Sequence, residues 1–476
     1  MALLLTSSTL HTATVNTLYK NITIPHSRVF RKFLDQIERR PQLGELVRRL
    51  DFSHFKRSYG QSAHERAQVM NLTHDTLLQC LHHLPNLQEF LMREEVEEDM
   101  SADVLCKLIN MPRMNALDFC GARSSGFVSV LNDTLNGLGL SRIPQILNIT
   151  RLSFHECVTT PAIVFTTLLP RLPHLTHLDL ANTRVQIQAL NSLPATARLT
   201  HLNLSRCYQI SGDDLVKFLV HHPSTQSLIY LNLHSDTRIH CVLDVQHVAS
   251  LLPNLPPTLK SLNMKGSKMM ITHTPLLKPL IYQLEELSLG SLPYLEVAKL
   301  LLPPCKEMMP HPSSATGAEF ANLLNEQTTF QPHTLKYLDM SDIPLSQIPW
   351  EQLIHSKLSL LRTPTRLDVL ELHSTVLECF STRTTDLSQW GWICKNEGRR
   401  GWLVRNPAAK PVTKVYHGDR LEKWSWKTPD GVREGEVADG GARTWKMGAK
   451  WWGMRKVGVA NMEVGGVYGW FMFNRA

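Results

Sequence analysis

The sequence predicts an α/β solenoid in which short strands alternate with helices, and two observations support this prediction. Leucine occupies 71 of the first 380 positions, far more than the core of an ordinary globular domain requires. The pattern L-x-x-L-x-L, with Val, Ile, Met or Phe allowed at the apolar positions, occurs eleven times between residues 47 and 375. Self-similarity of this kind is typical of leucine-rich repeats, so we expect a horseshoe of irregular leucine-rich repeats.

Each L-x-L pair is expected to form a strand whose leucines point into a shared core, while the residue between them faces the concave side. Successive copies advance by 24 to 51 residues, which is less regular than the usual spacing of about 20 to 29. A helical array of the HEAT type is the alternative, but an L-x-L pair suits a strand better than a helix. The copies start at Val47, Leu87, Met114, Ile149, Leu175, Leu199, Leu228, Leu259, Leu284, Leu335 and Leu367.

Helices are expected between the strands. Residues 75–84 and 212–220 carry apolar side chains at i, i+3 and i+4 spacing, and Asp75 is a candidate N-cap. Residues 27–39 have the same periodicity, and Pro41 is expected to end that helix. Cys157 and Cys207 follow their strands at the turn, where we expect buried, hydrogen-bonded structural roles.

Composition divides the chain into three parts, which we place at 1–42, 43–380 and 381–476. The last part contains 17 Lys+Arg and 9 Asp+Glu, while the first 380 residues contain 33 of each, so the whole net charge of +8 lies in the tail. Nine of the ten tryptophans lie there too. We expect a small β-rich or irregular cap over the last repeat, or a basic, Trp-rich surface for nucleic acid or anionic surfaces. An inserted loop is predicted near 303–333.

Several classes of protein are excluded by what the sequence lacks. No apolar run approaches about 18 residues and no signal-peptide pattern opens the chain, which argues against a membrane span and secretion. The nine cysteines form no C-x-x-C pair, which argues against a disulfide framework or structural zinc. Nucleotide-binding, protease and esterase motifs are absent. We therefore expect a non-enzymatic cytoplasmic or nuclear protein without cofactor or catalytic residues.

The concave face is the expected binding surface. The residue between the last two apolar positions of each copy is acidic five times, Asn three times and never Lys or Arg. This column favours basic or amide-rich protein segments, although Asp and Asn could instead satisfy backbone groups and water. The predicted substrate-binding residues are Asp118, Arg151, His155, His177, Asp179, His201, Asn203, Tyr230, Asn232, Asn263, Tyr337, Asp339 and Glu371.

Histidines mark one part of that face. His177 and His201 occupy the same place in adjacent copies, so their side chains should lie about 5 Å apart, with His155 one strand away. No thiolate or carboxylate completes a set of metal ligands with them. The sequence favours a pH-sensitive patch over a metal site.

The N-terminal residues carry a family resemblance. Leu18, Tyr19, Ile22 and Ile24 match a strand-like segment at the end of an F-box, and a first repeat follows at Pro41, Leu43, Val47, Leu50, Asp51 and Phe52. In this the chain resembles fungal F-box/leucine-rich-repeat proteins, although only the second half of the F-box motif is found. The resemblance implies a substrate receptor of an SCF-type ubiquitin ligase.

The same resemblance implies a Skp-type adaptor and a cullin as partners, beside a protein substrate. The implied adaptor-binding residues are Leu4, Leu10, Leu18 and Tyr19. Two alternatives stay open: an adaptor-independent scaffold built on the leucine-rich repeats, and nucleic-acid binding confined to residues 381–476.

Overall fold

A computed structural model describes the chain in two compact units, whose main segments meet between Leu228 and Ile229. The residues that it describes are 7–53, 55, 71–236, 241–302, 333–343, 353, 359–361, 367–381, 387–388, 390–397, 400–405, 415–417 and 420–422. Most of the predicted inserted loop and the tail beyond residue 422 lie outside these ranges.

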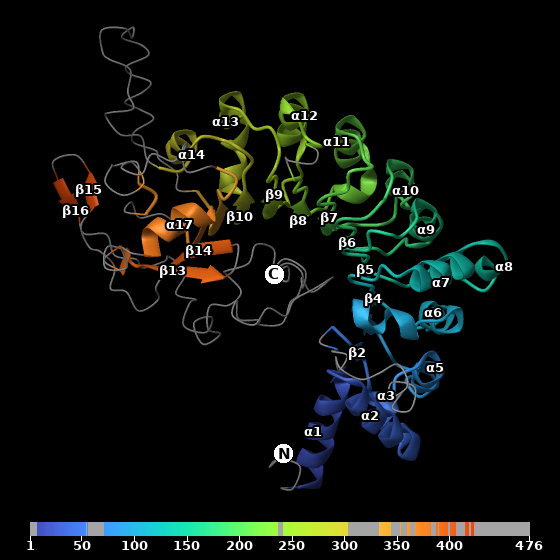
Figure 1. Cartoon of the computed structure of the whole chain (residues 1–476). Helices are drawn as coiled ribbons and strands as arrows, with labels where there is room; N and C mark the ends of the chain where they lie inside the picture. The colour runs from blue at the N-terminus through green and yellow to red at the C-terminus, as the bar shows by residue number, and fades with distance from the viewer. Residues whose placement is uncertain are drawn as a thin grey trace. The chain divides into compact units, whose positions relative to one another are not determined.

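The first unit is a ladder of short parallel strands, each paired with the next along the chain (Figure 1). The central residue of each strand from β2 onward, such as Leu152 and Leu178, is fully buried or nearly so. The strands are β1 (Asn21–Thr23), β2 (Arg49–Asp51), β3 (Glu89–Leu91), β4 (Ala116–Asp118), β5 (Arg151–Ser153), β6 (His177–Asp179) and β7 (His201–Asn203).

Helices connect these strands and lie on one side of them (Figure 1). In α2 the buried side chains are Phe30, Phe33, Leu34 and Ile37, as the periodicity predicts. The helices are α1 (Ser8–Lys20), α2 (Ser27–Arg39), α3 (Pro41–Leu46), α5 (His74–His82), α6 (Ala102–Ile109), α7 (Ser125–Leu135), α8 (Gly137–Leu140), α9 (Ala162–Leu168), α10 (Ile187–Asn191) and α11 (Gly212–His221), with 3-10 turns η2 (Glu94–Asp99), η3 (Leu169–Arg171) and η4 (Pro223–Thr225).

The second unit continues the same alternation. Strands β8 (Tyr230–Asn232), β9 (Ser261–Asn263), β10 (Glu286–Ser288), β11 (Tyr337–Asp339) and β12 (Val369–Leu372) pair in parallel. The described connecting elements are α12 (Val245–Leu251), η5 (Leu252–Asn254), η6 (Ile271–His273), α13 (Thr274–Leu277), η7 (Leu280–Tyr282), α14 (Tyr294–Leu301) and α17 (Ser374–Ser381).

A hairpin closes the sheet of the second unit after β12. Strand β14 (Arg400–Arg405) pairs antiparallel with β12, and β13 (Trp392–Glu397) pairs with β14. Trp392 and Trp402 are buried, and the indole N–H of Trp392 donates to the Leu361 carbonyl at 2.9 Å. The hairpin pairs the edge of β12, which is how exposed strand edges are protected. A separate small hairpin joins β15 (Val415–His417) to β16 (Arg420–Glu422).

The fold is the predicted α/β leucine-rich-repeat array, and all eleven predicted strands are confirmed. Each starts two residues after the first apolar position of its copy. The predicted helices are also present, as α5 and α11. The N-cap prediction is wrong: Thr73, not Asp75, caps α5, because Thr73 and Thr76 each accept the other's backbone N–H.

Two corrections concern the N-terminal segment. The ladder of parallel strands begins at Asn21 and not near residue 43, because β1 already pairs with β2. The leucine pattern did not include this strand, since Ile22 and Ile24 form a shorter apolar alternation. Leu18 and Tyr19 were expected in a strand-like segment, but they lie in the last turn of α1. Residues 21–42 therefore belong to the repeat array as its first strand and helix.

Glycine is required at the turn after β9. Gly266 has φ +81°, and a Cβ at this position would lie 1.9 Å from the Ser235 carbonyl oxygen. Its N–H donates to the Asp342 carboxylate at 2.6 Å. A side chain here would strain the backbone and push it away from that carboxylate.

We expect Gly266→Ala to lower the free energy of unfolding by about 2–4 kcal/mol. Gly126→Ala is the matched control, because its nearest neighbour would be the Ser124 hydroxyl at 3.9 Å and helix α7 favours alanine. Thermal unfolding of both variants checks the prediction. Equal melting temperatures for the two would contradict it.

Candidate binding surface

The face of the sheet away from the helices is formed by two rows of side chains. The first row precedes the central buried residue of each strand, and the second row follows it. In the first unit, the first row from β2 to β7 is Arg49, Glu89, Ala116, Arg151, His177 and His201, and the second row is Asp51, Leu91, Asp118, Ser153, Asp179 and Asn203.

The second row has a structural role. Its Asp and Asn side chains are buried, and each accepts a hydrogen bond from the backbone N–H two residues later. The acceptor–donor pairs are Asp51–Ser53, Asp118–Cys120, Asp179–Ala181, Asn203–Ser205, Asn232–His234, Asn263–Lys265 and Asp339–Ser341, at 2.9 to 3.2 Å. This pattern matches the alternative that Asp and Asn satisfy backbone groups where the chain leaves the strand. The expected preference for basic segments stays a prediction.

The first row of the first unit holds a three-residue ion network. The Glu89 carboxylate contacts the Arg49 guanidinium on one side and the Arg151 guanidinium, at 2.5 Å, on the other. Arg151 lies two strands from Glu89, and the residue between them is Ala116. A larger side chain at Ala116 would separate the two charges, so this small residue lets the network span four strands.

The two histidines of the same row are stacked. The ring centroids of His177 and His201 are 3.9 Å apart with an interplanar angle of 9°, which confirms the proximity predicted from their register. Burial, together with the charge of Arg151, lowers the pKa of His177 to about 4. His177 is therefore neutral at neutral pH.

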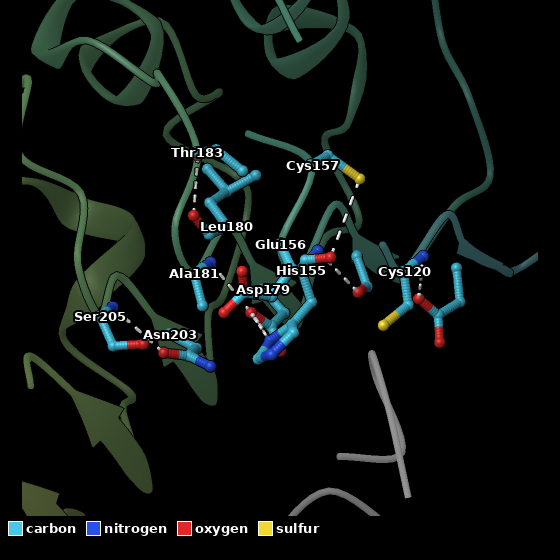
Figure 2. A network of polar contacts seen from close by, with 12 residues as sticks. Cys120, His155, Glu156, Cys157, Asp179, Leu180, Ala181, Thr183, Asn203 and Ser205 are labelled. Atoms are coloured by element: carbon cyan, nitrogen blue, oxygen red, sulfur yellow. Dashed lines mark hydrogen bonds and ion pairs between the residues drawn. The ribbon is translucent and has the colours of Figure 1, made fainter. Parts of the chain in front are cut away.

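Further polar contacts lie on the neighbouring strands. The Nδ1 atom of His155 lies 3.1 Å from the Asp179 carboxylate (Figure 2). The thiols of Cys157 and Cys207 donate to the Phe119 and Leu180 carbonyls, each at 3.0 Å. Burial acts to lower the pKa of His155, but Asp179 raises it above its ordinary value. Burial raises the pKa of both thiols, to about 12 for Cys207. The structural roles predicted for these cysteines are confirmed.

Acid should weaken the fold through His177. Because its folded-state pKa is lowered, the unfolded chain binds a proton that the folded chain does not as the pH falls from about 6.5 towards 4, so stability is lost in this window. His155 has the opposite sign: its raised pKa gives stability that is present below about 6.5 and is lost as the pH rises through the folded-state value.

We expect His177→Gln to gain about 2 kcal/mol over the wild type on going from pH 7 to pH 4.5. Denaturant unfolding at both pH values checks this. At pH 7 the two proteins carry the same charge at this position, so that comparison controls for lost packing. A stability difference that does not change with pH would contradict the assignment.

The second unit uses its predicted residues for internal contacts. The Tyr337 hydroxyl donates to the Glu371 carboxylate at 2.6 Å, and the Trp402 indole N–H lies 2.9 Å from that hydroxyl and 3.1 Å from the carboxylate. All three side chains are buried. Tyr230, Asn232, Asn263 and Asp339 are buried as well. The cap hairpin thus occupies one end of the predicted face.

The predicted adaptor-binding residues fall mainly on α1. Leu10 and Leu18 are 45% and 52% exposed, although both are large and apolar. Tyr19 is half-buried, and Leu4 lies outside the described residues. Helix α1 contacts α3 and β1, so it is attached to the first repeat.

Sequence reasoning missed three residues of these networks. Arg49 and Glu89 belong to the row before the central residue, from which only Arg151, His177, His201, Tyr230 and Tyr337 were predicted as binding residues. The signal was available, because opposite charges occupy the same position of adjacent copies. Trp402 had no such signal, since its place beside Glu371 depends on the pairing of β14 with β12.

Within the described residues, no group of three or more His, Cys, Asp or Glu side chains is placed to hold a metal ion. Across those same ranges, none of the helices combines the length and apolar character needed to cross a membrane.

Comparison with curated proteins gives a match in sequence. The chain is 30% identical over 192 residues to the F-box protein YLR352W of Saccharomyces cerevisiae. The match covers 37% of this chain and 24% of that protein, so the chain spans about a quarter of the length of this relative. No family model matches the chain.

Similar solved structures have low identity and low TM-scores. A chain of the Rad7–Elc1 complex of yeast has a TM-score of 0.38 at 12% identity, covering 71% of this chain and 83% of that one. Toll-like receptor TLR13 in its complex with ssRNA13 has 0.35 at 17%, covering 70% and 37%. The internalin InlF of Listeria monocytogenes has 0.29 at 14%, covering 53% and 76%.

Proposed function

We propose that this chain is a protein-interaction module, and that it serves as the substrate-recognition subunit of an SCF-type ubiquitin ligase. The observation that carries the proposal is the 30% identity with a yeast F-box protein over 192 residues. The partners in this proposal are a Skp-type adaptor, a cullin and a protein substrate.

The N-terminal helix gives the proposal its adaptor side. Helix α1 precedes the first strand and leaves Leu10 and Leu18 about half exposed, so burial of this apolar surface by a partner would be favourable. An adaptor that buried these two side chains would recover that free energy. The fully buried core of a protein interface is more apolar than its rim, and these two leucines suit such a core.

The sheet face gives the proposal its substrate side. In the first unit, the first row offers the Arg49–Glu89–Arg151 network and the His177–His201 stack on neighbouring strands. Charged groups held in fixed positions on a repeat surface favour specificity through complementary charge. We therefore propose that substrate recognition depends on the first row more than on the second row, whose Asp and Asn side chains accept backbone hydrogen bonds.

Purification of the tagged protein from fungal cells, with quantitative mass spectrometry, tests the proposal. We expect the adaptor and the cullin to be recovered with the wild-type chain, and both to be lost together when α1 is altered. Recovery of other proteins without adaptor or cullin would support the alternative, an adaptor-independent scaffold of leucine-rich repeats.

A further inference from the structure

A stripe of basic side chains runs along the outer face of helix α2. Arg28, Lys32 and Arg39 are exposed, and their positions lie within about 40° of one another around the helix axis. Exposed Arg40 follows directly after the helix. The stripe of these four residues is about 17 Å long from Arg28 to Arg39.

The four cations lack counter-ions within the part of the chain that the structure describes. Arg31 on the same helix pairs with Asp35 at 2.9 Å, and the Glu38 carboxylate accepts a hydrogen bond from Gln79 at 2.6 Å. Asp35 and Glu38 are the two acidic residues of α2, and these contacts are made with residues outside the stripe. The first 380 residues carry equal numbers of both signs, so the stripe is a local concentration of charge.

Local helix stability does not explain all of the stripe. Arg39 and Arg40 lie at the C-terminal end of α2, where cations interact favourably with the helix dipole. Arg28 lies in the first turn, which contains no acidic residue, and there a cation is unfavourable. A basic residue at this end favours a role outside the helix itself.

The surroundings of the stripe limit what could bind it. The apolar side chains of α2, including Phe30 and Phe33, are buried, so the helix cannot insert into a membrane surface. Its neighbours α3 and α5 carry exposed Glu45 and Asp75, which would repel a broad anionic surface such as duplex nucleic acid. The stripe therefore fits a ligand about as wide as one chain.

We propose that α2 is a docking surface for an acidic segment of a protein partner. In an extended segment, alternate side chains are about 6.7 Å apart, close to the rise of about 6 Å between Arg28 and Lys32. Guanidinium groups bind carboxylates through two parallel hydrogen bonds, which suits a stripe made mainly of arginine. This surface lies on α2, whereas the proposed adaptor surface lies on α1 and the proposed substrate surface on the first row.

The test uses the full chain and a photo-cross-linkable polyglutamate peptide as the probe. One variant carries Arg28→Gln, Lys32→Gln, Arg39→Gln and Arg40→Gln. The matched control carries the same four-charge change at exposed sites elsewhere, as Arg113→Gln, Arg184→Gln, Arg198→Gln and Lys278→Gln. Both variants keep the basic tail, so its contribution to binding is the same in each.

We expect the α2 variant to bind polyglutamate at least about tenfold more weakly than the control, with a shallower salt dependence. The peptide should cross-link to residues 27–40 of the wild-type protein, which does not depend on the folding of any variant. Equal affinities for both variants, or cross-links confined to other segments, would overturn the proposal. So would a loss of affinity seen with duplex DNA or phosphatidylserine vesicles but not with polyglutamate.

Discussion

Replacement of Trp402 with Ala is expected to lower the stability of the second unit by about 3–5 kcal/mol. Trp402 is fully buried, and its indole N–H contacts both the Tyr337 hydroxyl and the Glu371 carboxylate. The substitution removes one of the two buried tryptophans of the cap hairpin. It also takes one donor from a buried carboxylate, which is costly to leave undersatisfied.

Hydrogen exchange of the amides in β11 and β12 measures this loss within the second unit. Trp390→Ala is the matched control, because the Trp390 side chain is only half-buried and the hydrogen bond from Arg405 goes to the Trp390 backbone carbonyl. The control should lose far less protection. If both variants lost the same protection, Trp402 would not hold the cap in the way described.

The combined substitution Leu10→Gln and Leu18→Gln is expected to weaken adaptor binding at least about 100-fold. Both leucines are about half exposed in α1, so their replacement should leave the fold intact, and glutamine is a good helix former. The loss arises because two apolar side chains could no longer be buried at the interface. Pull-down with purified Skp-type adaptor measures the effect.

Ile163→Gln provides the control for that experiment. Ile163 is 49% exposed, and it lies on α9, away from the N-terminal segment in the chain. This variant should bind the adaptor as the wild type does. Equal adaptor binding by the α1 variant and the Ile163 variant would remove α1 from the interface.

The fold could be predicted from sequence because each strand buries an apolar side chain at the same position of the repeat. Residues such as Leu178 and Leu202 recur at one position of the pattern, and a parallel ladder follows once each copy forms a strand. Ile22 and Ile24 were expected in a strand-like segment, but the pairing of β1 with β2 was not predicted, because two apolar positions do not form a full copy of the leucine pattern. A β-rich cap after the last repeat was expected from composition, but the pairing of β14 with β12 could not be predicted, because it depends on tertiary structure.

The candidate binding surface was predicted only in part. The row positions of His177 and His201 follow from register, so their contact could be foreseen. The roles of Asp118 and Asp179 could not be foreseen. The sequence pattern is the same whether a carboxylate beside a strand binds a ligand or accepts a hydrogen bond from the backbone N–H two residues later. That choice depends on the turn of the main chain, which the sequence pattern does not specify.

Amide hydrogen exchange of the full chain, with and without purified Skp-type adaptor, tests the central claim most directly. We predict that the adaptor slows exchange in residues 8–24, which span α1 and β1, and leaves the strands β4 to β7 unchanged. Unchanged exchange in residues 8–24 at saturating adaptor, or protection confined to β4 to β7, would contradict the proposed ligase role of this chain.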